Sequence, residues 1–401
     1  MSAGFLFPAQ GQAFSEWQSD EASLSLRGFT GVDGGYSRNP QVTDYCDSRE
    51  DLLWNLDQRL LATAKYREHS RFDLNLLQNI RATPNASLGS RPLGTERSGL
   101  LSWQQHDSGN SEASLRVDTA ALHYTQENTE WSIGRQPVNL ATTMYFSPND
   151  FFAPFAAQTF YRTYKPGVDS GRVEVRLGNL AQLTLVGVLG YSPEGTGETE
   201  WRHRPDWSRN SLVARLAVNR NDWEWGVLGG SVREHRISGG SLQGELFDWL
   251  GIRAEGHYAA PEQEGGAGGS EASVGFEHRF ASSLELRLEQ FHHGQGYGSS
   301  EGLNQALAAN TLREGYTGRD YTALGASYEF SPLLTGQALV LANWSDHSQL
   351  LSLNGVYSLS DEAELAVTFS LPRGQEPEGT SIGSEFGLVP TTVTCSLRFY
   401  Y

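Results

Sequence analysis

The chain has 401 residues and a formal net charge of −17, and only 38% of its residues are hydrophobic. So few aliphatic residues disfavour a compact enzyme with several apolar cores, whereas 11% aromatic residues disfavour a disordered chain. The arginines are spread from Arg27 to Arg398 without a basic cluster, so no nucleic-acid partner is expected.

The first residues resemble the end of a secretion signal peptide. Residues 1–13 combine a short apolar stretch, Pro8 and small residues up to Ala13. We interpret 1–13 as a signal-peptide remnant or a disordered N-terminus, and 14–401 as a single domain. The longest apolar run, 183–191, is far shorter than the roughly 20 residues that a transmembrane helix needs.

Alternating apolar and polar side chains recur along the chain, most regularly from about residue 168 to the end. A period of two is typical of a strand with one face against an apolar environment. The alternation is strictest in 172–177, 251–258, 283–289 and 364–371. Weaker segments lie near 20–33, 52–66, 70–81, 112–125 and 130–136.

The connections between these segments alternate in length. Short turns at 219–222, 331–332 and 360–362 are interleaved with long stretches at 192–207, 261–269, 294–319 and 373–384. Transmembrane β-barrels have short turns at one end and long loops at the other. We therefore predict an all-β fold, a transmembrane antiparallel barrel of about 16–18 strands. A single soluble sandwich of so many strands would be unusual, and a propeller or β-helix would show a fixed repeat.

The last segment supports this prediction. Residues 391–401 place Val393, Cys395, Leu397, Phe399 and Tyr401 on one face and end on an aromatic residue. This closely resembles the C-terminal strand by which bacterial outer-membrane barrels are recognised for assembly. The alternative is an ordinary edge strand.

One segment departs from the strand pattern. Residues 139–166 contain several prolines and are rich in aromatic residues, and long connections without strand character are usually functional. We expect an aromatic-rich loop that folds into the lumen and narrows it, with charge presented near the constriction. The alternative is an extracellular loop that packs on itself. The candidate constriction residues are Asp150, Phe152, Phe155, Tyr161, Arg162 and Lys165.

Charged residues of both signs occupy the polar face of several predicted strands. Facing Arg and Glu side chains can set up a transverse field across a lumen, or they can be salt-bridged struts. The candidate pore-lining residues are Arg172, Glu174, Arg176, Arg215, Arg253, Glu255, Glu277, Arg279, Glu285, Arg287 and Glu289.

Four short motifs carry a family resemblance: Ile133–Gln136 (Ile-Gly-Arg-Gln), Ser147–Asp150 with Pro154, Lys165–Asp169, and Arg172–Val175. Over about 45 residues the chain resembles Gram-negative porin-like barrels of the alginate-export type. More loosely, it resembles the barrels that sheath multihaem cytochromes in metal-reducing bacteria. The second resemblance implies haem only in partner chains.

Signals for catalysis or metal binding are weak. His292 and His293 are adjacent, so on a strand they point to opposite faces and cannot readily share a metal. No GxSxG, HExxH or EF-hand pattern occurs, so no catalytic residue, metal or cofactor is predicted. Cys46 and Cys395 can pair or stay free.

These observations predict a porin in the bacterial outer membrane, a passive diffusion channel for small hydrophilic solutes. Its expected partners are membrane lipid, lipopolysaccharide and small polar solutes. The alternative is the barrel sheath of a porin–cytochrome complex, with multihaem c-type cytochromes as partners.

Overall fold

The computed structural model describes residues 14–40, 48–82, 96–107, 111–193, 203–262, 266, 268–308 and 316–401. The predicted signal-peptide remnant and Cys46 lie outside these ranges. Within them, no helix combines the length and the apolar character needed to cross a bilayer.

Eighteen of the described strands form one antiparallel sheet in which sequential strands are neighbours. They are β2 (Ala22–Arg38), β3 (Glu50–Tyr66), β4 (Ser70–Ala82), β6 (Ser111–Gln126), β7 (Thr129–Gln136), β8 (Val168–Leu177), β9 (Ala181–Val188), β12 (Ser211–Arg220), β13 (Trp223–Val232), β14 (His235–Leu246), β15 (Leu250–Pro261), β16 (Gly269–Arg279), β17 (Glu285–His293), β18 (Asp320–Ser331), β19 (Leu334–Asn343), β20 (Ser348–Ser360), β21 (Ala363–Arg373) and β22 (Thr391–Tyr400).

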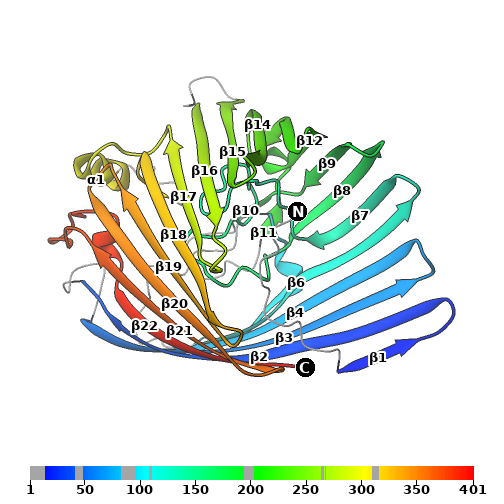
Figure 1. The fold of residues 1–401 in the computed structure, drawn as a ribbon, viewed down its shortest axis with the longest axis horizontal. Helices are drawn as coiled ribbons and strands as arrows, with labels where there is room; N and C mark the ends of the chain where they lie inside the picture. The colour runs from blue at the N-terminus through cyan, green and yellow to red at the C-terminus, as the bar shows by residue number, and fades with distance from the viewer. Residues whose placement is uncertain are drawn as a thin grey trace.

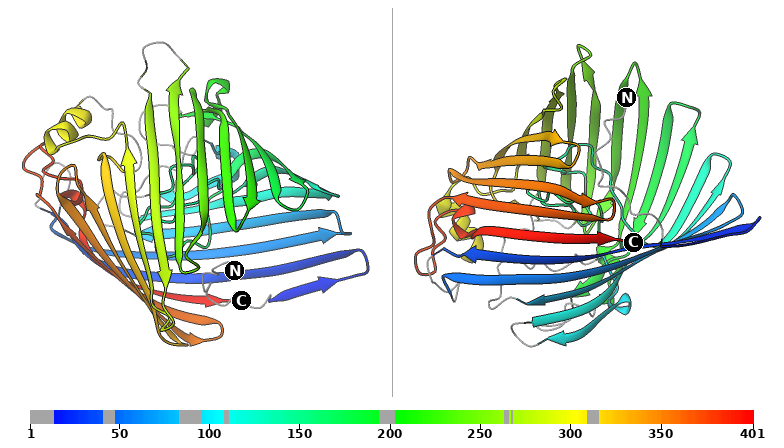
Figure 2. Two further views of the ribbon diagram at one scale, coloured as in Figure 1. Left: turned by 45° about the horizontal axis from the view of Figure 1, so that its top comes forward. Right: turned by 60° about the horizontal axis from the view of Figure 1, so that its bottom comes forward.

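The sheet closes on itself through its first and last strands. β22 pairs with β2 from Phe29↔Tyr400 to Arg38↔Thr391, and Tyr401 exchanges backbone hydrogen bonds with Gly28. Closure leaves no exposed edge along these strands, as a bilayer requires. The views in Figures 1 and 2 show the strands wrapped around a common interior. The predicted all-β barrel of about 16–18 strands is confirmed.

Several shorter elements accompany the barrel. β1 (Ser15–Gln18) pairs with the part of β2 that β22 leaves free, and β5 (Ser102–Asp107) pairs with β6. β10 (Tyr191–Pro193) and β11 (His203–Pro205) form a separate pair. The described helical segments are α1 (Ser300–Ala308), η1 (Gly99–Leu101), η2 (Trp207–Arg209) and η3 (Phe386–Leu388).

The two ends of the barrel differ in the length of their connections, as the sequence predicted. At one end the strands are joined by short turns, such as 127–128, 221–222 and 332–333. Asn221 and Asp222 both have positive φ, the conformation that a two-residue hairpin turn requires. The other end carries the long connections 137–167, 189–210, 294–319 and 374–390.

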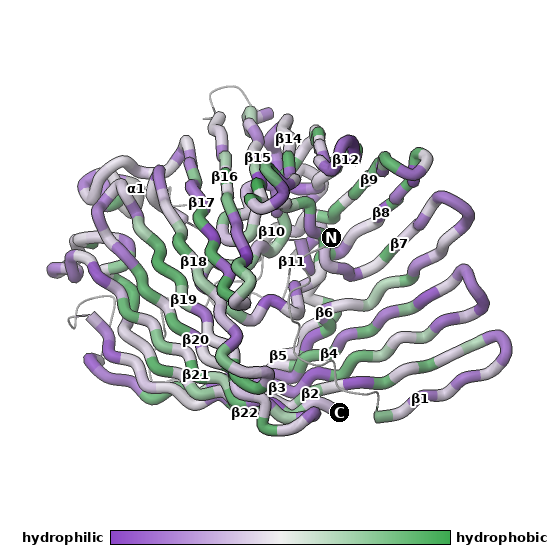
Figure 3. Tube along the Cα trace, in the orientation of Figure 1, coloured by the Kyte–Doolittle hydropathy of each residue, from purple (hydrophilic) through white to green (hydrophobic). Residues whose placement is uncertain are grey.

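The two faces of the strands differ in chemistry. Large apolar side chains are exposed on the outside, including Trp54, Ile133, Val227 and Phe399. The hydropathy trace alternates along the strands accordingly (Figure 3). Inner-face positions carry polar and charged residues, so lipid can cover the outside while the interior stays polar.

An arginine at position 227 tests which face meets lipid. Val227 is 60% exposed and lies midway along β13. We expect Val227→Arg to lower the free energy of unfolding by about 2–4 kcal/mol, because a charge near the bilayer midplane loses its hydration. Urea unfolding in lipid vesicles, followed by tryptophan fluorescence, measures the change. The matched control is Val227→Leu, and equal unfolding midpoints for the two variants would contradict the lipid-facing assignment.

Candidate functional site

The longest described connection between barrel strands, residues 137–167, leaves and re-enters the wall at one place. We call it the in-folded loop. β7 and β8 remain paired up to Gln136↔Val168, so the two stems of the loop lie side by side. Ile133 faces outward and is 67% exposed, whereas Arg135, two residues on, is buried inside. Gly134 makes this reversal possible: its φ is +124°, and a Cβ there would collide with the carbonyl oxygen of Ala120.

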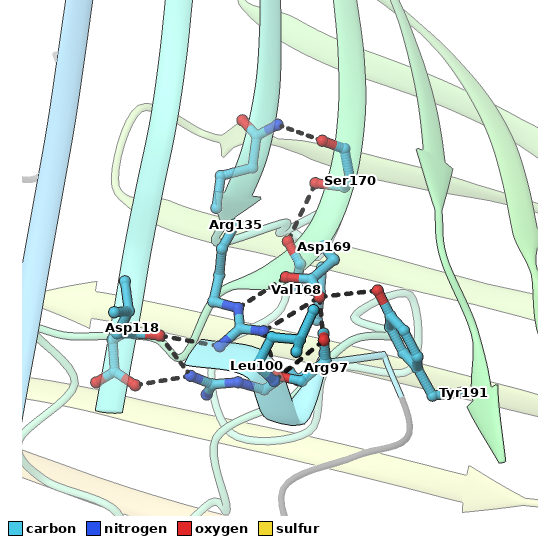
Figure 4. A network of polar contacts seen from close by, with 11 residues as sticks. Arg97, Leu100, Asp118, Arg135, Val168, Asp169, Ser170 and Tyr191 are labelled. Carbon is cyan, nitrogen blue, oxygen red and sulfur yellow. Dashed lines mark hydrogen bonds and ion pairs between the residues drawn. The ribbon is translucent and has the colours of Figure 1, made fainter. Parts of the chain in front are cut away.

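Arg135 holds the base of the loop together (Figure 4). Its Nε and Nη2 donate to the two carboxylate oxygens of Asp169 at 2.7 and 3.1 Å. Nη2 also donates to the Ser98 carbonyl at 2.7 Å, and Nη1 donates to the Val117 carbonyl at 3.2 Å. Tyr191 adds a hydroxyl donor to Asp169 at 3.0 Å. A bidentate arginine pair of this kind fixes direction as well as distance.

A second cluster lies beside the base, around Asp118 on β6. Its carboxylate lies 2.9 Å from Arg59, 3.0 Å from Arg97 and 3.4 Å from Arg116. The backbone N–H of Gly167 donates to the Asp118 carbonyl at 3.0 Å. Three guanidinium groups around one carboxylate leave an excess of positive charge on this part of the inner wall.

Two glutamates of the wall bind the backbone of the in-folded loop. Glu289 on β17 accepts hydrogen bonds from the N–H groups of Met144, Tyr145 and Phe146 at 2.7, 2.8 and 3.0 Å. Glu255 on β15 accepts from the backbone of Thr142 and, at 3.3 Å, of Asn149. Both glutamates are almost completely buried.

The far part of the loop reaches the opposite wall, where the barrel closes. The hydroxyl of Tyr161 lies 3.0 Å from that of Tyr400, and its ring lies under the guanidinium of Arg398 at 3.9 Å. Tyr164 stacks on Phe29 with ring centroids 5.6 Å apart. The loop therefore bridges the barrel interior, from β15 and β17 to β22 and β2.

Aromatic side chains of the loop fill the interior beside its attachments. Phe146 stacks on Phe291 of β17 at 5.0 Å and joins a buried cluster with Tyr321. Phe152 is 1% exposed and packs in a second apolar cluster, which includes Val186 of β9. Wall residues thus supply apolar contact to the loop at both places.

Between the loop and the β17–β19 wall lies a small, partly open pocket of about 50 Å³. The loop contributes Met144, Tyr145 and Arg162 to its lining, and the wall contributes Arg287 and Gly325. The ring of Tyr145 occupies the space that a Cβ at position 325 would need, so a glycine there lets the loop approach the wall.

The charged residues expected at the constriction stabilise the loop itself. Asp150 and Lys165 form a buried ion pair, and Lys165 also donates to the Val138 carbonyl at 2.6 Å. Arg162 donates to loop carbonyls, among them that of Thr159 at 2.8 Å. This differs from the expectation that these residues present charge to the lumen. The reason is that a loop packed in an interior must satisfy its own polar groups.

The predicted loop residues therefore have distinct positions. Phe152 is buried, Phe155 is partly buried, and Tyr161 contacts the opposite wall. Burial raises the pKa of the Asp150 carboxyl, against the opposing effect of Lys165. Burial likewise lowers the pKa of the Lys165 ammonium, against the effect of Asp150.

The strand register puts the eleven candidate pore-lining residues on the inner face. Most of them form ion pairs along the wall. Arg253 binds Glu277 at 3.1 Å, and Arg287 binds the same carboxylate at 3.2 Å. Further pairs along the wall are Arg287–Glu285, Arg215–Glu224 and Arg172–Glu174. Arg176 and Arg279 occupy inner positions near the short-turn end of the barrel. Glu255 and Glu289 face the loop.

Sequence reasoning missed the arginine clusters at the loop base. Arg135 belongs to the Ile-Gly-Arg-Gln motif, and its place directly before a long loop is the signal that could have identified it. Asp118 is the extra residue at a register shift in the β4–β6 pair, where Asn75 pairs with Thr119 and Leu76 with Val117, and this bulge obscures the alternation.

The paired histidines lie on opposite faces. His292 is exposed and lies 2.8 Å from Asp320, whereas His293 is buried and lies 3.1 Å from the Tyr316 carbonyl. In the part of the chain that the structure describes, no group of three or more His, Cys, Asp or Glu side chains could hold a metal ion.

Arg135→Lys tests the clamp at the loop base. Lysine keeps the charge but cannot make the bidentate bond to Asp169, so we expect the free energy of unfolding to fall by about 1–3 kcal/mol. The temperature at which the barrel loses its compact mobility on denaturing gels reports this loss. Arg176→Lys, at an exposed inner position, should change stability by less than about 0.5 kcal/mol. Equal shifts in the two variants would contradict the clamp.

Lys165→Met tests the buried ion pair. We expect a loss of about 3–5 kcal/mol near neutral pH, because Asp150 is left buried without its partner. The raised pKa of Asp150 means that the native variant binds more protons than the unfolded chain. Its stability should therefore recover as the pH falls through the window between the raised native pKa and the unfolded value of about 3.9.

The double variant Asp150→Asn, Lys165→Met is the control for this titration. It lacks the titrating carboxyl, so its urea unfolding midpoint should lack the acid recovery. If Lys165→Met lost the same stability at every pH, the buried-pair interpretation would be wrong.

No protein-family model and no curated protein sequence matches this chain. Among solved structures, OccK9 (OpdG) of Pseudomonas aeruginosa superposes with a TM-score of 0.59 at 13% identity, over 94% of this chain and 98% of its own. OccAB3 of Acinetobacter baumannii gives 0.56 at 11% identity, over 94% and 99%. A triple mutant of the Rhodopseudomonas blastica porin gives 0.46 at 12% identity, over 94% and 100%.

Identities this low establish similarity of fold alone. The barrel closure, the apolar outer face and the two superpositions agree with one another. The chain has the fold of a porin-like outer-membrane β-barrel.

Proposed function

We propose that the protein is a porin of the bacterial outer membrane, a passive channel for small hydrophilic solutes. The observation that carries the proposal is a loop bonded to both walls inside a barrel whose inner face is polar. Such a loop narrows the lumen, while the barrel walls around it remain apart. Solutes would move down their concentration gradient along the polar wall, while lipid and lipopolysaccharide cover the outside.

Residues 139–166 are the proposed constriction. Its attachments on both sides, through Glu289 and through Tyr161, support a narrowing that holds its shape. The proposed pore lining is the set of inner-wall arginines and glutamates described above, with the excess positive charge near Asp118. Since most of these charges are paired, lumen width would contribute to selectivity beside charge.

The sheath alternative fits the interior less well. A cytochrome threaded through the barrel would need the space that the in-folded loop occupies. Displacing the loop would break the Glu289 and Glu255 hydrogen bonds and unstack Phe146 from Phe291. The diffusion channel is therefore the function we propose.

Conductance in planar bilayers tests the proposal. The purified protein should give steady ion conductance, and deleting residues 141–163 should raise it because the obstruction is removed. Deletion of α1, residues 300–308, is a suitable control, since its described contacts are with Tyr297, Ile382 and Leu388 rather than with the in-folded loop. Unchanged conductance after removal of 141–163 would contradict the constriction, and absent conductance in the intact protein would contradict the channel.

A further inference from the structure

The two walls hold the in-folded loop by different chemistry. On the β15 and β17 side, two carboxylates take up five backbone N–H groups of residues 142–149. On the opposite side, Tyr161 and Tyr164 make hydroxyl and aromatic contacts, with Arg398 and Arg59 over their rings. Arginine and tyrosine keep their protonation states from acid to neutral pH. The carboxylate on this second side, Glu364, binds Tyr400 at 2.7 Å and Arg398 at 3.1 Å, so it acts on the loop only through those two residues.

The hydrogen-bond donors around Glu289 favour its ionised carboxylate. Three successive N–H groups, from Met144 to Phe146, converge on its two oxygens. Consecutive backbone amides arranged this way form an anion-binding concavity. A protonated carboxyl is a weaker acceptor and carries an O–H that needs an acceptor of its own. The bonds to the loop therefore depend on the negative charge.

Charged and phenolic side chains from the loop and from β17 lie near Glu289. From the loop, the guanidinium of Arg162 and the phenol of Tyr145 lie near it, and on the inner face of its own strand Arg287 and Glu285 precede it. Arg287 is occupied by Glu277 and Glu285, and Arg162 by loop carbonyls. These cations therefore have other partners and leave the loop amides as the direct ligands of Glu289.

Glu255 repeats the arrangement on β15. It accepts from the backbones of Thr142 and Asn149, and the Asn149 side chain donates to the Gly240 carbonyl at 3.1 Å. Arg253 on the same strand binds the Thr142 carbonyl at 3.3 Å and Glu277. His257, two residues further along β15, packs its ring against Phe151 from the loop.

We propose that Glu255 and Glu289 are positioning residues whose negative charge tethers the in-folded loop to the wall, so that acid releases residues 142–149 and changes the width of the channel. The inference rests on the proposed channel function, but the tether itself does not. Released loop amides exchange with solvent and the loop takes up more than one position.

Glu289→Gln is the decisive variant, because it keeps the size of the side chain and removes the charge. Glu255→Gln tests the second tether. The matched control is Glu224→Gln, which removes a charge from an inner-wall glutamate that pairs with Arg215 at 2.8 Å beside the short turn 221–222. Wild-type protein compared at about pH 7 and about pH 4, across the ordinary glutamate pKa of about 4.3, needs no substitution at all.

Two independent measurements report whether residues 142–149 stay bound to the wall. Hydrogen–deuterium exchange of the peptide covering 142–149 reports the loop amides, whether or not the protein conducts. Single-channel recording reports transitions to a second conductance level. At about pH 7, Glu289→Gln should speed exchange of these amides and raise the occupancy of the second level by at least about 10-fold over wild type, since charged hydrogen bonds are lost. Wild type at about pH 4 should show the same second level.

The outcomes separate the two proposals. Fast exchange at 142–149 in Glu289→Gln but not in Glu224→Gln supports the tether. Equal exchange in both variants and in wild type overturns it, even if the protein conducts. Fast exchange in a protein that never conducts supports the tether and overturns the channel.

Discussion

The need to pair every backbone N–H and C=O group governs this molecule. Hydrocarbon supplies no partners, so the sheet must close, and it does so where β22 meets β2 at Phe29↔Tyr400. Closure in turn sorts the side chains: those on the outside, such as Val227, are apolar, and those on the inside are polar. The low overall hydrophobicity of the chain follows from this division, since only one face needs apolar residues.

The same requirement explains the interior. A loop of 31 residues without strands, running from 137 to 167, brings many unpaired backbone groups away from solvent. Charged side chains satisfy them. Glu289 and Glu255 accept from loop N–H groups, while Arg162 and Lys165 donate to loop carbonyls. Charges that a sequence suggests for solute recognition thus hold the loop in position.

Period-two patterns predicted most of the barrel, because the alternation within one strand reflects the environments on the two faces of that strand. The outward face of β22, the turn at Asn221 and Asp222, and the division between short and long connections could all be read without a structure. The irregular parts were missed. Arg135 faces inward because Gly134 adopts a positive φ, and Asp118 is the extra residue at a register shift, so simple alternation fails at both.

The sequence by itself determined the fold class, the approximate strand number, the lipid-facing positions and the existence of an unusual aromatic segment. Tertiary structure alone decided what that segment touches and which of the charged side chains pair with one another. The difference is physical: alternation is a property of neighbouring residues in one strand. The bonds of Glu289 to Met144–Phe146 join segments about 145 residues apart and depend on how the barrel closes.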